Sequence, residues 1–452
     1  MKKLMMIAAM AMAYVSIATP QVGSVLVRQN WPWSTDIRVT YELSGITQPV
    51  DLIVKGYNDG QEVAIPDSAI SGDIYRITES GVREFTINPS VVFGGSSLVA
   101  VSNFKVELSV TEELYKGEIL YKIFDLENGG VEDVKRADIL SGKKGSYVTS
   151  YSDIDSRYST GLDDDEVLIW TGVANDTQYA KNKLVMRLIK AKDVVWSMGS
   201  PSEERGRSAN ETQHSVKFTN DYYIAVFPLT VYQANVSGLK PSGLTRWEYG
   251  NYLDAHGDKD LMPATMSLGY SRGSYTWPAD GHLVDSARYL GKLRALFNNE
   301  YEFDVTTEAQ WEFACRGGTT TILYDGRGYS NSDDTYMTAN AGQLLGWSNG
   351  NSASTSGDTS TRGYWPVGMK NPNAYGLYDM VGNISERCLD YYAADYGGTD
   401  GVQIDPVGPA SGTQNVFRGG NYALDASYYR SAKRTNTVSG GYEGLRFAFP
   451  VK

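Results

Sequence analysis

The chain has 452 residues, of which 41% are hydrophobic and 21% are charged. This composition is typical of a folded globular protein, and the length exceeds what one hydrophobic core usually organises, so we expect two or three domains. The formal charge of −12 is opposite to the basic surface that binding to nucleic-acid phosphates requires, so nucleic acid is not an expected partner.

The first eighteen residues have the pattern of an export signal. Lys2 and Lys3 precede an apolar run over 4–15, and Ser16-Ile17-Ala18 has the small-x-small spacing of a cleavage site. The apolar run is too short for a membrane helix, and no later run approaches the roughly 20 residues that one needs. We therefore expect residues 1–18 to be a signal peptide, no membrane span, and a secreted, periplasmic or cell-surface location.

Residues 21–112 alternate apolar and polar side chains with a period of two. Ile37, Val39 and Tyr41 fall on one face of a predicted strand, and residues 104–110 repeat the pattern. Turn-forming residues interrupt the alternation at short intervals, as they do between the strands of a sandwich. The pattern predicts an N-terminal immunoglobulin-like β-sandwich domain.

Residues 113–182 have a mixed character. The segment 117–126 predicts one additional strand, because it is rich in Ile, Tyr, Leu and Phe. Residues 152–166 are acidic, rich in Ser and Gly, and without periodicity. We expect this stretch to be a linker with one additional strand.

Three helices can be predicted farther along the chain. Thr230 with Gln233, and Thr307 with Gln310, match the capping box, in which a hydroxyl and an amide bond each other's backbone N–H groups at a helix start. Between these two starts, residues 285–297 place leucines at helical spacing on one stripe, which predicts an amphipathic helix.

Four segments beyond residue 183 carry motifs. They are MGS at 198–200, TTEAQWEFACRGG at 306–318, NPNAYGLYDMVGNISERCLD at 371–390 and RGGNYALDASYYRSAKR at 418–434. In this order they resemble the formylglycine-generating enzyme family, also called sulfatase-modifying factors, over residues 183–450. The resemblance implies a loop-rich, C-type-lectin-like domain over 183–452 with a small twisted sheet and few helices. The fold class expected for the whole chain is therefore α+β.

Family members that carry out the oxidase chemistry bind copper between two nearby thiols of the last motif. The resemblance places Leu424 and Tyr429 at those two positions, and neither side chain replaces the soft thiolates that Cu(I) prefers. The only cysteines of the chain, Cys315 and Cys388, lie in other motifs, where we expect buried free thiols. We therefore expect no copper, no formylglycine-generating activity and no catalytic residue of that kind.

The same resemblance implies a structural calcium site. Asn383, Ile384 and Glu386 would supply an amide oxygen, a main-chain carbonyl oxygen and a carboxylate, which are the hard donors that calcium takes. Family members often carry calcium at this motif. The alternative is that Glu386 only accepts backbone hydrogen bonds in a tight turn, and the sequence leaves both interpretations open.

The last motif has the composition of a recognition surface. Tyrosine rings in short loops supply rigid contact area, while Ser, Asn and Asp adjust their hydrogen bonds. We therefore expect a protein or glycan ligand to bind a face that bears Tyr422, Leu424, Asp425, Tyr428 and Tyr429. The segment also resembles the variable segment of lectin-fold proteins diversified by retroelements, although divergence of a paralogue that lost its thiols would give the same composition.

Two other classes of function stay open on the sequence. One is an oxidoreductase of the formylglycine-generating enzyme family with a divergent active site, which would convert a peptide thiol to an aldehyde. The other is a structural surface component whose domains only pack against other chains. A large exposed apolar patch and higher-order assembly would favour that second class.

Overall fold

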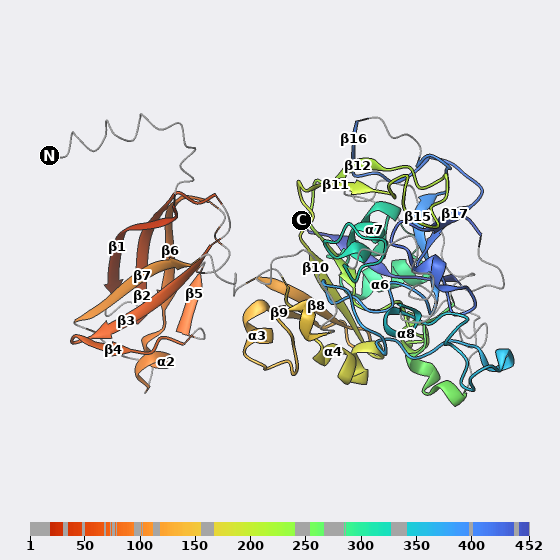
Figure 1. Ribbon diagram of the computed structural model, residues 1–452. Coiled ribbons are helices and arrows are strands. Elements are labelled where there is room, and N and C mark those ends of the chain that lie inside the picture. Colours follow the sequence, from red (N-terminus) through yellow and green to blue (C-terminus); the bar gives the residue numbers. More distant parts are fainter. Residues whose placement is uncertain are drawn as a thin grey trace. The chain divides into compact units, whose positions relative to one another are not determined.

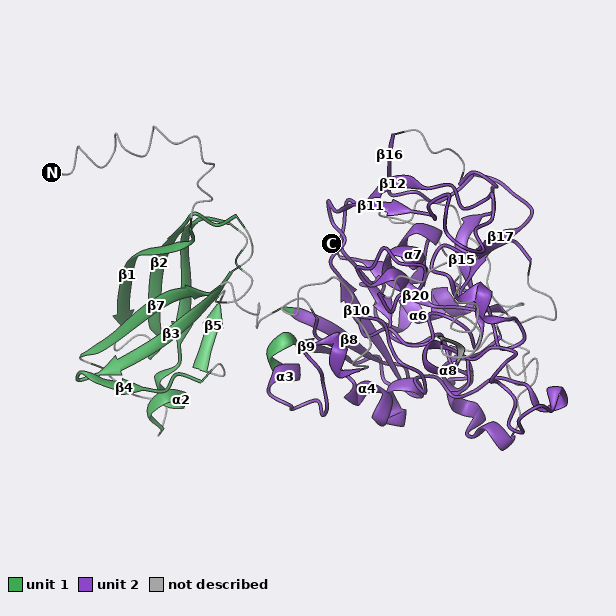
Figure 2. Cartoon of the chain, viewed as in Figure 1, with its two compact units in different colours: residues 1–118, 135–137 green, residues 119–134, 138–452 purple. Residues whose placement is uncertain are grey.

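The computed structural model describes residues 19–29, 35–47, 50–66, 69–72, 74, 77, 79–94, 101, 103–111, 118–154, 167–239, 254–265, 284, 286–326, 341–396, 401–437 and 443–451. The chain divides into two compact units, which Figure 2 distinguishes by colour: residues 1–118 with 135–137, and residues 119–134 with 138–452. The expected signal peptide lies outside the described residues. Within them, no helix has both the length and the apolarity needed to cross a bilayer.

The first unit consists of two antiparallel sheets (Figure 1), with strand orders β1-β2-β6-β5 and β4-β3-β7. The bounds are β1 Gln21–Gln29, β2 Ile37–Ser44, β3 Asp51–Asn58, β4 Gln61–Val63, β5 Ile70–Gly72, β6 Gly81–Ile87, α2 Pro89–Phe93 and β7 Phe104–Thr111. Ile37 and Val39 of one sheet share a core with Leu52 and Val106 of the other, as the period-two pattern predicts. The immunoglobulin-like topology itself stays a prediction.

The second unit is built around a six-stranded sheet of order β14-β20-β13-β10-β8-β9. Its strands are β8 Ile119–Asp125, β9 Val131–Lys135, β10 Lys183–Ile189, β13 Tyr222–Ala225, β14 Asp304–Val305 and β20 Phe447–Pro450. Strand β8 pairs antiparallel with β10, with Asp125 opposite Lys183. The additional strand that we expected inside a linker is therefore an interior strand of this sheet, because its apolar side chains on both faces are buried.

Two smaller sheets complete the second unit. One has the order β11-β12-β16 and the other the order β18-β17-β15-β19. Their strands are β11 Val195–Met198, β12 His214–Lys217, β15 Ser385–Tyr391, β16 Val402–Ile404, β17 Asn415–Arg418, β18 Arg434–Thr435 and β19 Glu443–Gly444. In the printed sequence, β17 and β18 lie on either side of the segment expected to bind a ligand, so that segment is anchored at both ends.

The helices of the described residues are short. The α-helices that follow α2 are α3 Arg136–Leu140, α4 Gly172–Asn175, α5 Val231–Ala234, α6 Tyr289–Leu296, α7 Glu308–Arg316 and α8 Ala341–Leu345. The 3₁₀ helices are η2 Tyr151–Asp153, η4 Thr177–Ala180, η5 Asp254–His256, η6 Lys259–Leu261, η8 Thr359–Thr361 and η9 Ala426–Tyr429. Both predicted capping boxes are present, at the starts of α5 and α7. A mixed α/β fold that is rich in sheet and poor in helix is therefore confirmed.

Candidate functional site

Helix α7 carries two carboxylates into the interior of the second unit. Glu308 and Glu312 lie one turn apart on this fully buried helix. Arg418 donates from Nε to Glu308 Oε1 at 2.8 Å and from Nη2 to Glu312 Oε2 at 2.7 Å. Arg434 donates to both oxygens of Glu308, at 2.7 and 2.6 Å. Both ends of the last motif are therefore tied to α7 by charge-assisted hydrogen bonds.

The charges of this cluster are balanced by neighbours of opposite sign. Burial alone would raise the pKa of Glu312, but the guanidinium groups of Arg316 and Arg418 outweigh burial and hold this pKa below its ordinary value. Arg430, which lies between Arg418 and Arg434, donates to both oxygens of Glu211 at 2.7 Å. The arginines of the last motif thus brace the fold and are not directed at a ligand.

The residues expected to hold calcium have other partners. Glu386 accepts from the Arg446 guanidinium at 2.7 to 3.1 Å and from Trp311 Nε1 at 2.7 Å. Asn383 Oδ1 accepts from the backbone N–H of Trp365 at 3.1 Å, and Ile384 is fully buried. A guanidinium therefore faces the Glu386 carboxylate in this structure, and the calcium site stays a prediction.

The alternative interpretation, in which Glu386 only accepts backbone N–H groups, is not what the structure has, because the donors to this carboxylate are the side chains of Trp311 and Arg446. No signal near the motif in the sequence could have identified Arg446, which lies 60 residues farther along the chain. Within the ranges that the structure describes, no three His, Cys, Asp or Glu side chains are grouped to hold a metal ion.

Neither cysteine compensates for the missing thiol pair. Cys315 and Cys388 are free and fully buried. Burial raises the pKa of the Cys315 thiol to about 12 and places the pKa of Cys388 well above its ordinary value. Thiolates are the species that bind soft metals, so these two residues do not fit copper. At the family's two thiol positions stand Leu424, which is half-buried, and Tyr429, which is fully buried.

Two of the five residues expected to contact a ligand are inaccessible. Tyr422 is 1% exposed and Tyr429 is 0% exposed, so the expectation that they bind a partner is wrong. Tyr422 packs edge to face against Tyr364, with ring centres 4.8 Å apart. The order of exposed and buried positions could not be predicted, because the segment combines a turn with the single short 3₁₀ helix η9 and so has no sustained periodicity. The accessible residues, which we call the 423–428 surface, are Ala423, Leu424, Asp425, Ser427 and Tyr428.

Local hydrogen bonds order the 423–428 surface. Asp425 caps η9 by accepting from the backbone N–H of Ser427 at 2.9 Å, and the carbonyl oxygen of Leu424 accepts from the backbone N–H of Asn349 at 2.9 Å. The Lys433 ammonium lies 5.2 Å from the centre of the Tyr428 ring. A surface whose backbone is already fixed loses little conformational entropy when it binds a partner.

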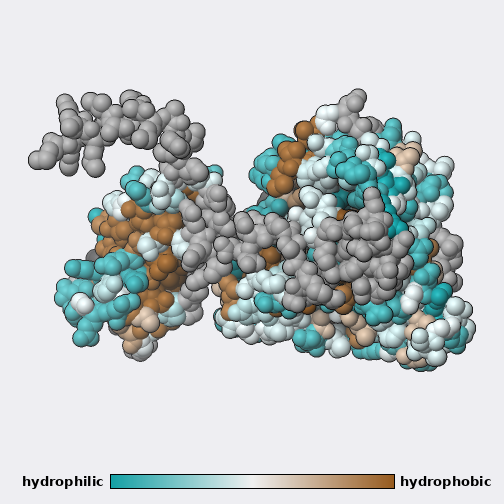
Figure 3. All heavy atoms as spheres, viewed as in Figure 1, coloured by the Kyte–Doolittle hydropathy of each residue, from teal (hydrophilic) through white to brown (hydrophobic). Residues whose placement is uncertain are grey.

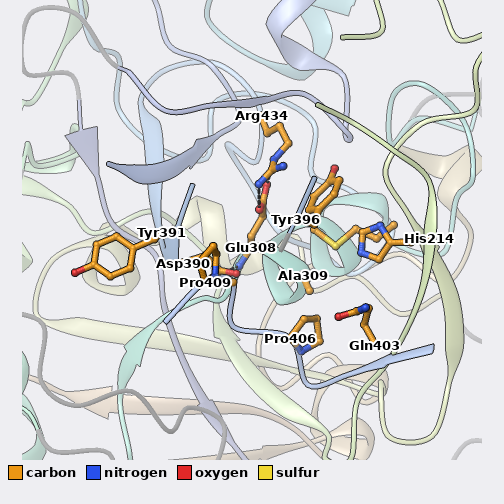
Figure 4. A pocket seen from close by; sticks show the side chains of 12 residues that line it. His214, Glu308, Ala309, Asp390, Tyr391, Tyr396, Gln403, Pro406, Pro409 and Arg434 are labelled. Carbon is orange, nitrogen blue, oxygen red and sulfur yellow. Dashed lines mark hydrogen bonds and ion pairs between the residues drawn. The ribbon is translucent and has the colours of Figure 1, made fainter. Parts of the chain in front are cut away.

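Figure 4 shows a small cavity beside α7. The ion pair of Glu308 and Arg434 lies at one end of it, and His214 and Tyr396 lie along one side. Its free volume of about 10 Å³ has room for roughly one water molecule. In this structure the cavity is therefore too small for a ligand larger than water.

Exposed aliphatic side chains gather on the sheet β11-β12-β16, where Figure 3 shows brown on the surface. Val195 stands opposite Lys217, and Lys217 stands opposite Ile404, in one row across the three strands. Val195, Val402 and Ile404 are 58%, 48% and 59% exposed. The structural-component alternative predicts self-association through a patch of this kind.

Comparisons with known proteins agree with the arrangement of the second unit. Residues 190–448, more than half of the chain, match the family described as "Sulfatase-modifying factor enzyme 1-like domain". The chain is 36% identical to the formylglycine-generating enzyme of Thermomonospora curvata over 151 residues, which are 31% of this chain and 48% of the relative. It is 28% identical to the serine/threonine-protein kinase pkn1 of Chlamydia caviae over 274 residues, 58% of this chain and 38% of that one.

Among solved structures, Treponema denticola variable protein 1 is similar, with a TM-score of 0.42 and 23% identity over 60% of this chain and 96% of that one. The chain spans less than half of the length of either of the two curated relatives.

Proposed function

We propose that this chain, which belongs to the family of sulfatase-modifying factor enzyme 1-like domains, is a secreted or surface-exposed ligand-binding protein. It uses the family scaffold without the copper-binding thiols. The export-signal pattern at residues 1–18 supports the location, and the net charge of −12 suits a protein that stays dispersed outside the cell.

The observation that carries the proposal is the replacement at the two thiol positions. Leu424 is partly exposed, Tyr429 is buried, and both cysteines of the chain are buried in other elements. The frame around these positions is intact, because Arg418 and Arg434 hold the segment to α7 from both ends. A rigid frame that presents contact residues at the former reaction centre suits binding better than redox chemistry.

We propose that Leu424, Asp425 and Tyr428 make the contacts with a protein or glycan ligand. Leu424 offers an apolar contact, Asp425 a carboxylate acceptor, and Tyr428 a ring with a hydroxyl group. Aromatic residues of this kind dominate the binding free energy in many interfaces. Tyr422 and Tyr429 support this surface from beneath.

Site-specific crosslinking tests the proposal. A photoreactive residue at position 424 or 428 should capture a ligand from extracellular material, and the same residue at the exposed Ser356 should not. The captured ligand is then titrated against purified protein. Leu424→Ala combined with Tyr428→Ala should weaken binding at least tenfold, which corresponds to about 1.4 kcal/mol. Equal affinity of this variant and the unmodified protein would contradict the proposed surface.

A further inference from the structure

We propose that the second unit carries a carbohydrate-binding site, separate from the 423–428 surface, in a polar cavity beside α4. The cavity lies between residues 143–146, which follow α3, and the segment from α4 to η4. Its volume is about 400 Å³, within the range of small-molecule sites of roughly 300–1,000 Å³. It shares no lining residue with the 423–428 surface, so neither proposal depends on the other.

The walls of the cavity are fixed by backbone contacts. Trp170 is fully buried, and its Nε1 donates to the carbonyl oxygen of Lys144 at 2.7 Å. The backbone N–H of Gly172 donates to the carbonyl oxygen of Ser146 at 2.7 Å. A Cβ atom on Gly172 would lie 2.7 Å from the Lys144 oxygen, so only glycine allows the two segments to come this close. The cavity is therefore formed before any ligand arrives.

The lining carries both hydrogen-bond donors and hydrogen-bond acceptors. Ser146 Oγ accepts from Thr171 Oγ1 at 3.0 Å and from Asn175 Nδ2 at 3.2 Å, which leaves its own hydrogen able to donate. Asn175 Oδ1 has no donor among the described residues, and the Asp176 carboxylate can accept further bonds beyond those from Gln178. Each hydroxyl group of a sugar donates one bond and accepts others, so a ligand rich in hydroxyls suits this mixture.

The charges of the cavity favour a neutral ligand. Lys143 pairs with Asp138 at 3.4 Å, and Lys144 pairs with Glu132. Asp176 adds a carboxylate, so the lysines do not create the excess positive charge that a phosphate or sulfate ligand requires.

A tyrosine ring supplies the apolar part of the lining. The half-buried Tyr179 is held edge to face against Trp170, with ring centres 4.9 Å apart. Tyrosine combines an apolar ring with a polar tip, which matches the C–H face and the hydroxyl edge of a pyranose. Ring, amide, hydroxyl and carboxylate groups together favour a neutral oligosaccharide over an anion.

Calorimetric titration of the full chain with maltotriose, mannotriose, cellotriose, xylotriose and chitotriose tests the site, with sialyllactose and inorganic phosphate as anionic probes. At least one neutral trisaccharide should bind saturably. Loss of a hydrogen bond in Asn175→Ala, or of the ring in Tyr179→Ala, should weaken that binding about tenfold. The matched control Thr177→Ala alters an exposed neighbour that does not line the cavity and should bind as the unmodified protein does.

Three results would overturn the proposal: no neutral probe binds, only the anionic probes bind, or Asn175→Ala binds as tightly as Thr177→Ala. If Tyr179→Ala does not fold, Tyr179→Phe keeps the packing against Trp170, and Asn175→Ala decides the outcome. The double variant Leu424→Ala/Tyr428→Ala should keep its trisaccharide affinity. This control separates failure of the cavity from failure of the 423–428 surface.

Discussion

Arg446 illustrates how single residues hold the second unit together. Its guanidinium group is fully buried and is shared between the Glu386 carboxylate and the main-chain carbonyl oxygens of Ala225, Val226 and Tyr378. A buried charge is tolerated when hydrogen bonds and an opposite charge compensate it. Removal of one partner leaves the other as an uncompensated charge in the interior.

We expect Arg446→Met to lower the free energy of unfolding by about 3–5 kcal/mol, because Glu386 loses its counter-charge in the interior. Urea unfolding followed by circular dichroism measures this change. The control is Lys217→Met, since Lys217 pairs with Asp193 at the surface, where the two side chains are 31% and 65% exposed. An exposed pair contributes about 1 kcal/mol or less. A similar decrease in the free energy of unfolding in both variants would show that the buried ion pair of Arg446 and Glu386 stabilises the fold no more than an exposed pair does.

Asp379 links stability to pH. Its carboxylate is buried and accepts from the backbone N–H of Gly368 at 2.7 Å. Burial raises the pKa of Asp379 from 3.8 to about 6. The folded state therefore binds this proton more tightly than the unfolded state, so the contribution of Asp379 to stability falls as pH rises from about 4 to about 6.

Asp379→Asn should remove this part of the pH dependence, which is on the order of 3 kcal/mol. Asn also tolerates the left-handed backbone at this position, where φ is 53°. Unfolding free energies at pH 4 and pH 6.5 test the expectation. If the variant and the unmodified protein lose the same stability between these two pH values, another group is responsible.

At the scale of elements, the turn between β17 and the 423–428 surface depends on glycine. Gly419 has a φ of +83°, and a Cβ atom there would lie 2.7 Å from the carbonyl oxygen of Met380. Gly357 has the same φ of +83°, but a Cβ atom there would have no neighbour within 4 Å. Alanine at Gly357 would therefore cause backbone strain alone, whereas alanine at Gly419 would cause the same strain and a steric collision.

We expect Gly357→Ala to cost about 1 kcal/mol of unfolding free energy from strain alone. Gly419→Ala should cost roughly 1–3 kcal/mol more, because the backbone of Met380 must move away. Chemical denaturation of the two variants measures the difference. Equal costs would show that the approach of Gly419 to Met380 is not a constraint on the fold.

The sequence predicted those elements that depend on interactions between residues close together in the chain. The capping boxes at Thr230 and Thr307 were recognisable because their partners lie three residues away. The partner of β8 could not be predicted, since Asp125 faces Lys183 only after the sheet has assembled. The ligand of Glu386 and the burial of Tyr422 likewise depend on contacts made by distant segments.

At the scale of the whole molecule, the chain joins a unit of two β-sheets and a short helix to a unit of the sulfatase-modifying factor family. The family assignment could be predicted from four motifs, because their order is preserved although the last motif holds no cysteine. The missing thiol pair was also visible in the sequence, since only two cysteines exist. The motifs could not show that both cysteines are buried. They also could not show that ion pairs between carboxylates of α7 and arginines of the last motif hold that motif in place.

The central claim is that this scaffold binds a partner and does not oxidise a thiol. Purified protein is incubated with copper, oxygen and a cysteine-containing peptide of the sulfatase type, and the peptide mass is followed over time. The formylglycine-generating enzyme of Thermomonospora curvata serves as the positive control. We predict that the peptide keeps its thiol in the presence of this chain. Catalytic conversion of that thiol to an aldehyde would contradict the claim.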